Sequence, residues 1–273
     1  MAVYEVYAHT EVGLVRQKNE DHMLVGRFIK NQGSLRLFFS RDDDFLKEHG
    51  LVFAIADGIG GEAGGEIASK EALKTLDQRF YTVEKHNDPR LFMEALKKAI
   101  HQSNQRLLQC ARDNIEYAHM GCTLSGICLV SPQYFVVFNV GDSRVYRYRA
   151  PELTLLTEDD TVTHWAMKTG KMDIKEARRS AQRHRLTNFL GYESFSCTIE
   201  RGPLLHVEDV ILICSDGLHD LVEEDHIATI LSEKTFSLPT LGKKLADQAV
   251  DNGGNDNISL ILMRYGHNGR VEL

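Results

Sequence analysis

The sequence predicts a single domain of the α+β class. Strand patterns open the chain, two helical patterns follow, and further strands precede a last helix and a last strand. This order lacks the strand–helix–strand alternation that favours a parallel sheet. At roughly 150 residues per domain, the length allows one domain or two. No proline- or serine-rich linker and no internal repeat divides the 273 residues, so we expect one domain over residues 1–273.

The first strands are predicted from short apolar or alternating runs. These runs are Val3–His9, Gly33–Phe39 and Leu51–Ala56. Residues 27–50, which include Arg41-Asp42-Asp43-Asp44, are longer than two strands require. We therefore expect a hairpin with an elaborated loop in this segment, which would also be available for a regulatory contact.

Two helices are predicted next. An apolar residue recurs every fourth position at Ala68, Ala72, Leu76 and Phe80, which gives a helix one apolar stripe. Asp88-Pro89 then has the form of an N-cap followed by proline at the first helical position. Apolar residues at helical spacing continue this second helix to about Arg112.

Strand patterns return in the second half of the chain. Three β-rich runs separated by Ser131-Pro132 and Gly141-Asp142 predict a meander of antiparallel strands. The runs are Thr123–Val130, Tyr134–Val140 and Ser143–Arg149. Residues 158–185 are polar and predict short pieces of helix. The end of the chain predicts a strand, a helix and a strand, at Val210–Cys214, Leu238–Val250 and Ile258–Tyr265.

Composition excludes several classes of protein. Hydrophobic residues are 42% and charged residues 26%, as in soluble globular proteins. The net charge of −7 disfavours broad binding to nucleic acid. No apolar run approaches the roughly 18 residues of a membrane span, and Met1–Val12 lacks the pattern of a signal peptide. The five cysteines form no C-x-x-C pair, which predicts reduced thiols in a cytoplasmic protein.

Acidic residues stand at the ends of the predicted strands. Taken singly, each is an ordinary turn residue. If they converge, each carboxylate pair at ~4 Å costs about 4 kcal/mol at an effective dielectric near 20, and a divalent cation would relieve the repulsion. Oxygen ligands favour Mg²⁺, Mn²⁺ or Ca²⁺, and the sequence has no zinc motif. The acids are Glu20, Asp21, Asp57, Asp142, Asp216 and Asp256.

A glycine-rich turn strengthens the prediction of a metal site. Residues 57–66 contain five glycines before the first predicted helix. Glycine permits close backbone approach, so a carbonyl of this turn can bind a metal ion, and a helix N-terminus favours anions. The segment lacks the Gly-Lys-Ser/Thr of a P-loop and a clean G-x-G-x-x-G, so nucleotide binding is the weaker alternative.

Six motifs occur in a fixed order from about Tyr4 to Tyr265. Together they resemble the metal-dependent serine/threonine protein phosphatases of the PPM (type 2C) family in its compact bacterial form. The motifs are Arg16-x-x-Asn19-Glu20-Asp21, Ala56-Asp57-Gly58-x-Gly60-Gly61 with Gly65-Glu66-x-Ala68-Ser69, Gly121-Cys122-Thr123-Leu124, Val140-Gly141-Asp142-Ser143-Arg144, Ser215-Asp216-Gly217-Leu218 and Asn255-Asp256-Asn257-Ile258-Ser259.

The resemblance implies a fold and an activity. The fold is a four-layer αββα sandwich of two antiparallel sheets between helix pairs, with a flap at about residues 157–191. The activity is hydrolysis of phosphoserine and phosphothreonine in proteins by a metal-bridging hydroxide, without a phosphoenzyme. Such a phosphatase is expected to act as a monomer and to oppose a bacterial Ser/Thr kinase. It is expected to bind no nucleic acid and no membrane.

The resemblance also implies the metal ligands. Asp57 would bridge two Mn²⁺ or Mg²⁺ ions. The Gly58 carbonyl and Glu20 would serve one ion, and Asp216 and Asp256 would serve the other.

Three further roles follow from the same resemblance. Asp21 would orient the metal-bound water, and Arg16 would bind the substrate phosphate, which suits a fork-shaped guanidinium. Asp142, together with Asp216, would hold a third, weaker ion.

The chain departs from the family pattern near the site. Ile59 stands where animal members carry a histidine proposed as general acid, so no side-chain acid is assigned. Glu62 replaces a histidine common in bacterial relatives, and two polar changes occur in the flap motif Arg183–Gly191. Lys171–Arg185 holds six basic residues against two acids, which fits a solvated helix face or a surface for acidic or phosphorylated segments.

Two other functions remain open at the level of sequence. One is a binding module that holds phosphoproteins without turnover, although Asp57, Asp216 and Asp256 are intact here. The other is a phosphatase of a small phosphorylated metabolite.

Overall fold

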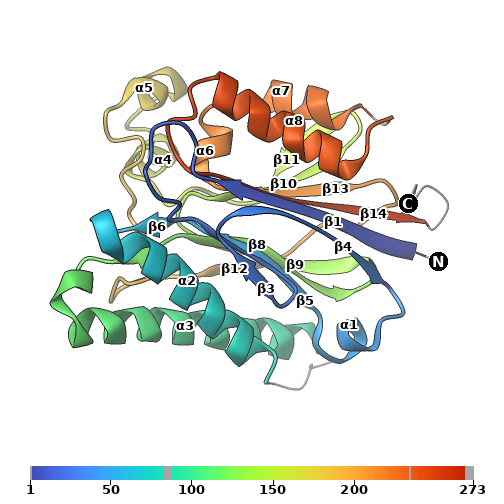
Figure 1. Cartoon of the computed structure of the whole chain (residues 1–273), viewed down its shortest axis with the longest axis horizontal. Coiled ribbons are helices and arrows are strands. Elements are labelled where there is room, and N and C mark those ends of the chain that lie inside the picture. The colour runs from blue at the N-terminus through green and yellow to red at the C-terminus, as the bar shows by residue number, and fades with distance from the viewer. Residues whose placement is uncertain (1, 83–87, 234, 268–273) are drawn as a thin grey trace.

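Two six-stranded sheets face each other in the computed structural model, which describes residues 2–82, 88–233 and 235–267 (Figure 1). Neighbouring strands pair antiparallel in both. The first sheet runs in the order β11 (Glu152–Leu155), β10 (Arg144–Arg149), β13 (Val210–Cys214), β14 (Ile258–His267), β1 (Ala2–Glu11) and β4 (Gly33–Ser40). The second runs in the order β12 (Thr198–Arg201), β9 (Tyr134–Val140), β8 (Leu124–Ser131), β5 (Leu51–Ala56), β2 (His22–Val25) and β3 (Phe28–Lys30).

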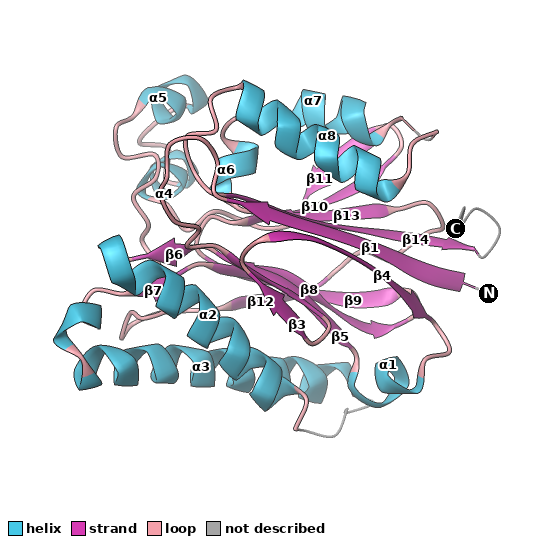
Figure 2. Ribbon diagram, in the orientation of Figure 1, coloured by secondary structure: helices cyan, strands magenta, loops and turns pink. Residues whose placement is uncertain are grey.

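Helices cover the outer face of each sheet, so the predicted four-layer sandwich is confirmed (Figure 2). The second sheet is covered by α2 (Gly61–Phe80) and α3 (Pro89–Asp113), and the first by α6 (Asp216–His219), α7 (Glu224–Leu231) and α8 (Leu238–Asp251). The smaller elements are α1 (Asp44–His49), α4 (Val162–Lys168), α5 (Ile174–Arg179), a 3₁₀ turn at Ile115–Tyr117, and the pair β6 (Gly58–Ile59) and β7 (Gly121–Cys122).

The strand β5 shows how the layers are built from sequence. All six residues of β5 are buried, because both faces of the strand are covered. Leu51, Phe53 and Ile55 belong to the core between the sheets. Val52, Ala54 and Ala56 belong to the core beneath α2 and α3. A strand covered on both sides reads as a continuous apolar run, which is the pattern the sequence shows.

Local signals fix the helix ends where the sequence predicts them. Asp88 caps α3, since its side chain accepts a hydrogen bond from the Arg90 backbone N–H at 2.8 Å, and Pro89 occupies the first turn. The apolar stripe predicted for α2 lies against the second sheet.

Two predictions about strand connections are wrong. The runs around residue 141 do not form one meander, because β9 lies in the second sheet while β10 pairs with β13 in the first. Gly141, at φ 101°, turns the chain from one sheet to the other. The 27–50 segment is likewise not one hairpin: β3 pairs with β2, whereas β4 pairs with β1 in the other sheet. Apolar side chains of β4 pack into the inter-sheet core, which favours that pairing.

The ends of the predicted 1–273 domain, residue 1 and residues 268–273, lie outside the described residues, as do residues 83–87 and 234.

Candidate metal centre and active site

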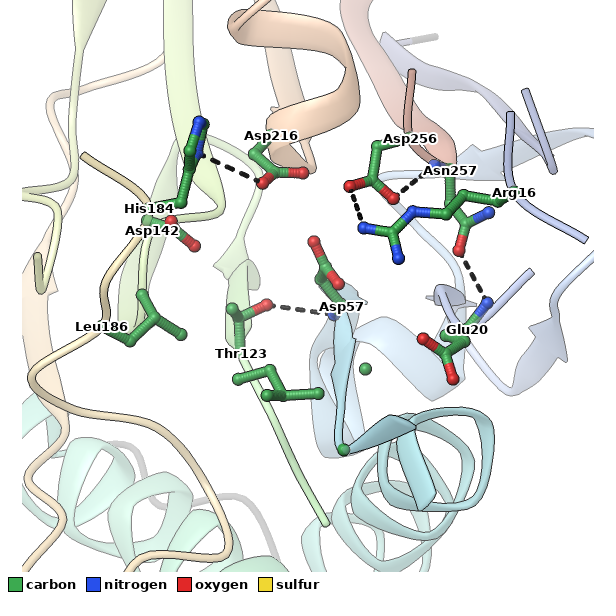
Figure 3. A pocket seen from close by; sticks show the side chains of 13 residues that line it. Arg16, Glu20, Asp57, Thr123, Asp142, His184, Leu186, Asp216, Asp256 and Asn257 are labelled. Carbon is green, nitrogen blue, oxygen red and sulfur yellow. Dashed lines mark hydrogen bonds and ion pairs between the residues drawn. The ribbon is translucent and has the colours of Figure 1, made fainter. Parts of the chain in front are cut away.

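A cavity of about 250 Å³ opens at one end of the sandwich (Figure 3). Every predicted site residue except Asp21 lines it: Arg16, Glu20, Asp57, Gly58, Asp142, Asp216 and Asp256. These residues come from five separate stretches of the chain, so the fold gathers the acids that the sequence scatters. The structure thus brings onto one cavity the acids that the sequence places at separate strand ends.

The acids reach the cavity from the ends of strands in both sheets. Asp57 directly follows β5 of the second sheet. Asp216 begins α6, just after β13 of the first sheet, and Asp256 lies two residues before β14. Asp142 lies in the turn by which the chain passes from β9 to β10, and Glu20 precedes β2. A rigid strand end behind each carboxylate gives the site a fixed geometry.

Burial and mutual repulsion raise the pKa values of these acids. For Asp57 the pKa is raised well above its ordinary value, first by burial and then by the charges of neighbouring aspartates, Asp21 before Asp216. Burial followed by Asp216 raises the pKa of Asp142 in the same way. The pKa of Asp216 is also raised, by burial and then by Asp256. Negative charge concentrated this closely is unfavourable without a compensating cation.

The residues present fit a hard divalent cation. Asp216 Oδ1 and Asp21 Oδ1 are buried and have no hydrogen-bond partner among the described residues. The predicted ligand set contains carboxylates and one carbonyl, and oxygen ligands are those that Mg²⁺ and Mn²⁺ take. Buried carboxylate oxygens without donors are the atoms that a metal ion would satisfy.

Asp21 lies behind the cavity instead of lining it. The residue is 1% exposed, and its Oδ2 accepts a hydrogen bond from the Ser215 hydroxyl at 2.8 Å. Burial raises the pKa of Asp21 to about 7, although hydrogen bonds from Ser259 and Ser215 act in the opposite direction. Asp21 thus supports the acids of the cavity from behind.

The glycine-rich turn brings three segments into contact. A Cβ on Gly58 would lie 2.3 Å from the Gly65 carbonyl oxygen and 2.7 Å from the Glu20 carbonyl oxygen. A Cβ on Gly65 would lie 2.8 Å from Glu20 Cδ. Because no side chain fits there, the turn, the start of α2 and the loop that carries Glu20 can touch.

Arg16 and Asn257 organise the loop before β2. Arg16 Nη2 donates to Asp256 Oδ2 at 2.6 Å. The Asn257 amide donates to the Val12 and Lys18 carbonyls at 3.0 and 2.9 Å, while its Oδ1 accepts from the Glu20 backbone N–H at 2.8 Å. Asn257 belongs to a motif of the sequence but had no predicted role. Its position next to Asp256 was the only signal.

Further cavity residues had no predicted role, among them Thr123, His184 and Leu186. Thr123 Oγ1 accepts from the Asp57 backbone N–H at 3.0 Å and lies 2.8 Å from Ser143 Oγ, so it joins the Asp57 and Asp142 turns. His184 reaches the cavity from the predicted flap, where the sequence showed only a departure from the family motif (Figure 3).

The 157–191 segment contains α4 and α5, as its polar pattern predicts. Its far end is bound to β7, next to the cavity residue Thr123, because backbone N–H groups of Cys122 and Leu190 donate to each other's carbonyls at 3.0 and 2.8 Å. The basic residues of 171–185 that the structure describes are exposed. The side chains of Arg178 and Glu62 lie outside the described part.

No helix within residues 2–82, 88–233 and 235–267 has both the length and the apolar composition of a membrane span.

Comparison with known proteins identifies the relatives of this fold. A model of the family "Protein phosphatase 2C" matches residues 39–250. The serine/threonine phosphatase stp of Listeria welshimeri is 28% identical over 254 residues, which are 93% of each chain. A Streptococcus agalactiae serine/threonine phosphatase structure has a TM-score of 0.82 at 23% identity, covering 96% of this chain and 99% of that one. The PstP catalytic domain with two manganese ions has a TM-score of 0.76 at 26% identity, covering 98% and 100%.

Proposed function

Because this chain belongs to the protein phosphatase 2C family, we propose that it is a metal-dependent enzyme that hydrolyses phosphoserine and phosphothreonine in proteins. The observation that carries the proposal is the convergence of buried carboxylates on one cavity beside an arginine. Relatives similar over 93% of this chain are named serine/threonine phosphatases, and a similar structure holds manganese.

The metal ligands are the acids of the cavity. Asp57 would be a ligand of two divalent ions, one also held by the Gly58 carbonyl and Glu20 and the other by Asp216 and Asp256. Asp142, with Asp216, would hold a third and weaker ion. Asp216 Oδ1, which has no hydrogen-bond partner in the described part of the chain, supports this assignment. Divalent cations held by such ligands lower the pKa of bound water, which supplies a nucleophile near neutral pH.

Two side chains, Arg16 and Asp21, would bind the substrate phosphate and orient the attacking water. Arg16 binds the oxygens of the substrate phosphate through its fork of N–H donors and balances their charge. Asp21 would orient the metal-bound water from behind the cavity, and its Oδ1 has no hydrogen-bond partner among the described residues. Because Ile59 cannot donate a proton, the leaving serine or threonine oxygen takes its proton from solvent or from a cavity water.

The cellular setting follows from the same resemblance. The enzyme acts as a monomer in the cytoplasm, in signalling, on phosphorylated protein segments, and opposes a Ser/Thr kinase. The 157–191 flap contributes to the choice of substrate, since His184 and Leu186 of this segment line the cavity.

The test compares the purified protein with two variants. With Mn²⁺, wild type should hydrolyse an aryl phosphate and phosphopeptides, and EDTA should stop both reactions. Asp216→Asn should lower kcat/KM at least about 100-fold. Changing a residue that only hydrogen-bonds to a metal ligand costs up to about 100-fold, and loss of a ligand should cost no less. Circular dichroism checks its fold, and Asp251→Asn, an exposed acid at the end of α8, is the matched control.

A fully active Asp216→Asn enzyme would overturn the metal assignment. A panel of phosphopeptides and phosphorylated metabolites separates protein phosphatase from metabolite phosphatase. Metal binding with no turnover of any member of the panel would favour the phosphoprotein-binding module.

A further inference from the structure

The 157–191 segment carries a basic surface at the rim of the active-site cavity. Its part Lys171–Arg185 holds six basic residues against two acidic ones, a net charge of +4 in a chain whose net charge is −7. Five of the six basic side chains are described by the structure, and all five are exposed. We call them the basic flap surface: Lys171, Lys175, Arg179, Arg183 and Arg185.

Arg185 joins this surface to the cavity. Its neighbours in the chain, His184 and Leu186, both line the cavity, and Figure 3 shows them on the side opposite Arg16. The backbone of Arg185 is fixed, because its carbonyl accepts a hydrogen bond from the Val162 N–H at 2.9 Å. A cavity of about 250 Å³ holds a phosphorylated side chain but not the peptide around it. The residues that flank the phosphorylated residue must therefore lie over the rim.

The two acids of the segment do not neutralise the basic flap surface. Asp173 Oδ1 accepts a hydrogen bond from the Glu176 backbone N–H at 2.8 Å, and Glu176 Oε2 accepts one from the Asp173 backbone N–H at 2.8 Å. Both carboxylates thus cap the start of α5. Among the described residues, Lys175, Arg179 and Arg185 have no ion-pair or side-chain hydrogen-bond partner.

The spacing of the charges also indicates an acidic partner. Lys175 and Arg179 lie four positions apart on α5, where like charges repel each other and destabilise a helix. Tight turns after α5 keep the chain coiled, since the Ser180 N–H donates to the Ala177 carbonyl at 3.1 Å and the Arg183 N–H donates to the Ser180 carbonyl at 3.2 Å. A face that is only solvated would gain from opposite charges at this spacing, whereas a negatively charged partner would relieve the repulsion.

We propose that the basic flap surface binds acidic residues of the substrate protein beside the phosphorylated serine or threonine, so that the enzyme selects phosphosites in acidic sequences. The inference rests on the proposed function, because the occupant is the flank of its substrate. The carboxylates of the cavity repel an acidic peptide, so its attraction comes from the rim. An exposed ion pair contributes little alone, and several basic residues therefore act together. Such complementary charge raises the association rate and the selectivity for a partner.

Phosphopeptides that differ only in their flanks test the proposal. They share one phosphothreonine and carry glutamate, glutamine or lysine on both sides of it. With wild type and Mn²⁺, kcat/KM should be at least about fivefold higher for the glutamate peptide than for the glutamine peptide, mainly through a lower KM, and lowest for the lysine peptide. The preference should shrink as ionic strength rises from roughly 0.05 M to about 1 M, because salt screens exposed charges.

Charge reversal assigns the preference to the surface. Lys175→Glu combined with Arg185→Glu should lower the glutamate-to-glutamine ratio of kcat/KM to about one or below. A ratio taken within one protein cancels any general change in activity. Lys175→Gln combined with Arg185→Gln repeats the measurement should the reversed protein fail to fold. Lys243→Glu, an exposed lysine of α8, is the matched control and should keep the wild-type ratio.

The outcomes separate the surface from the proposed function. Equal kcat/KM for the three peptides on wild type, or a ratio that the double charge reversal leaves unchanged, overturns the surface. So does a single-stranded oligonucleotide that inhibits hydrolysis at lower concentration than an unphosphorylated glutamate peptide, because nucleic acid would then be the ligand. If no peptide is hydrolysed, the proposed function fails, and fluorescence anisotropy of the labelled peptides decides the surface: the glutamate peptide must bind wild type more tightly than the double variant.

Discussion

Asn257 positions the loop at residues 12–20, which carries Arg16 and Glu20. Its side chain makes three hydrogen bonds to the loop that carries Arg16 and Glu20. Asn257→Ala leaves two carbonyls and one N–H without partners, which costs about 1–3 kcal/mol of unfolding free energy for each group that stays buried. We expect KM for an aryl phosphate to rise several-fold, because Arg16 loses its position, and kcat to fall less.

The control for this prediction is Asn252→Ala. Asn252 also donates to a loop carbonyl, that of Leu221 at 2.6 Å, but it does not line the cavity. Its KM should equal that of wild type. An unchanged KM in Asn257→Ala would show that the loop holds its shape without the amide.

The acids of the site could be predicted from sequence, whereas the neutral residues around them could not. Carboxylates at strand ends can be recognised in the sequence, and where such strand ends come together their negative charge needs a cation. The structural role of Asn257 or Thr123 depends on which backbone groups the side chain can reach. For Asn257 one such group is the Lys18 carbonyl, 239 positions away in the sequence. No local pattern encodes such a partner.

A substitution at the junction between β6 and α2 should disturb the start of α2. Gly58→Ala would place Cβ 2.3 Å from the Gly65 carbonyl oxygen, which is backbone and cannot rotate away. The turn or the helix start must shift, at a cost of about 1–3 kcal/mol or more. We expect a lower urea midpoint and weaker Mn²⁺ binding. Gly266→Ala in β14, whose Cβ meets nothing closer than 3.9 Å, should change neither.

Strand boundaries were predictable, but sheet membership was not. Leu51–Ala56, Tyr134–Val140 and Val210–Cys214 form strands over the predicted residues, because their apolar patterns reflect burial, which sequence records. Which strand pairs with which depends on turns such as that at Gly141 and on competition between sheet edges. Both β4 and β10 therefore lie in sheets that periodicity alone did not indicate.

Charge is the property of the whole molecule that the site changes most. The formal net charge is −7, and the acids of one cavity contribute a large part of that excess. Bound cations would make the protein less negative and would stabilise the folded state, since ions that bind only the folded form add about 2.7 kcal/mol at 100 times their dissociation constant. EDTA should accordingly lower Tm, and the loss should be restored by Mn²⁺.

The dependence of stability on pH should reverse when the metal is removed. Burial, the largest cause, raises the pKa of Asp21 from its ordinary 3.8 to about 7 in the folded protein. Between these values the folded state holds a proton that the unfolded chain has released, so the free energy of unfolding falls as pH rises, and the loss is complete above about pH 7. Asp57, Asp142 and Asp216 act in the same direction, because their pKa values are also raised.

In EDTA, urea unfolding should therefore show greater stability at about pH 5.5 than at about pH 8, by on the order of a few kcal/mol. Asp21→Asn should reduce that difference, since an amide binds no proton. Stabilisation by Mn²⁺ should instead grow with pH, because the ligands must be deprotonated. An EDTA-treated wild type whose advantage at low pH is no larger than that of Asp21→Asn would contradict the assignment of a buried, proton-binding Asp21.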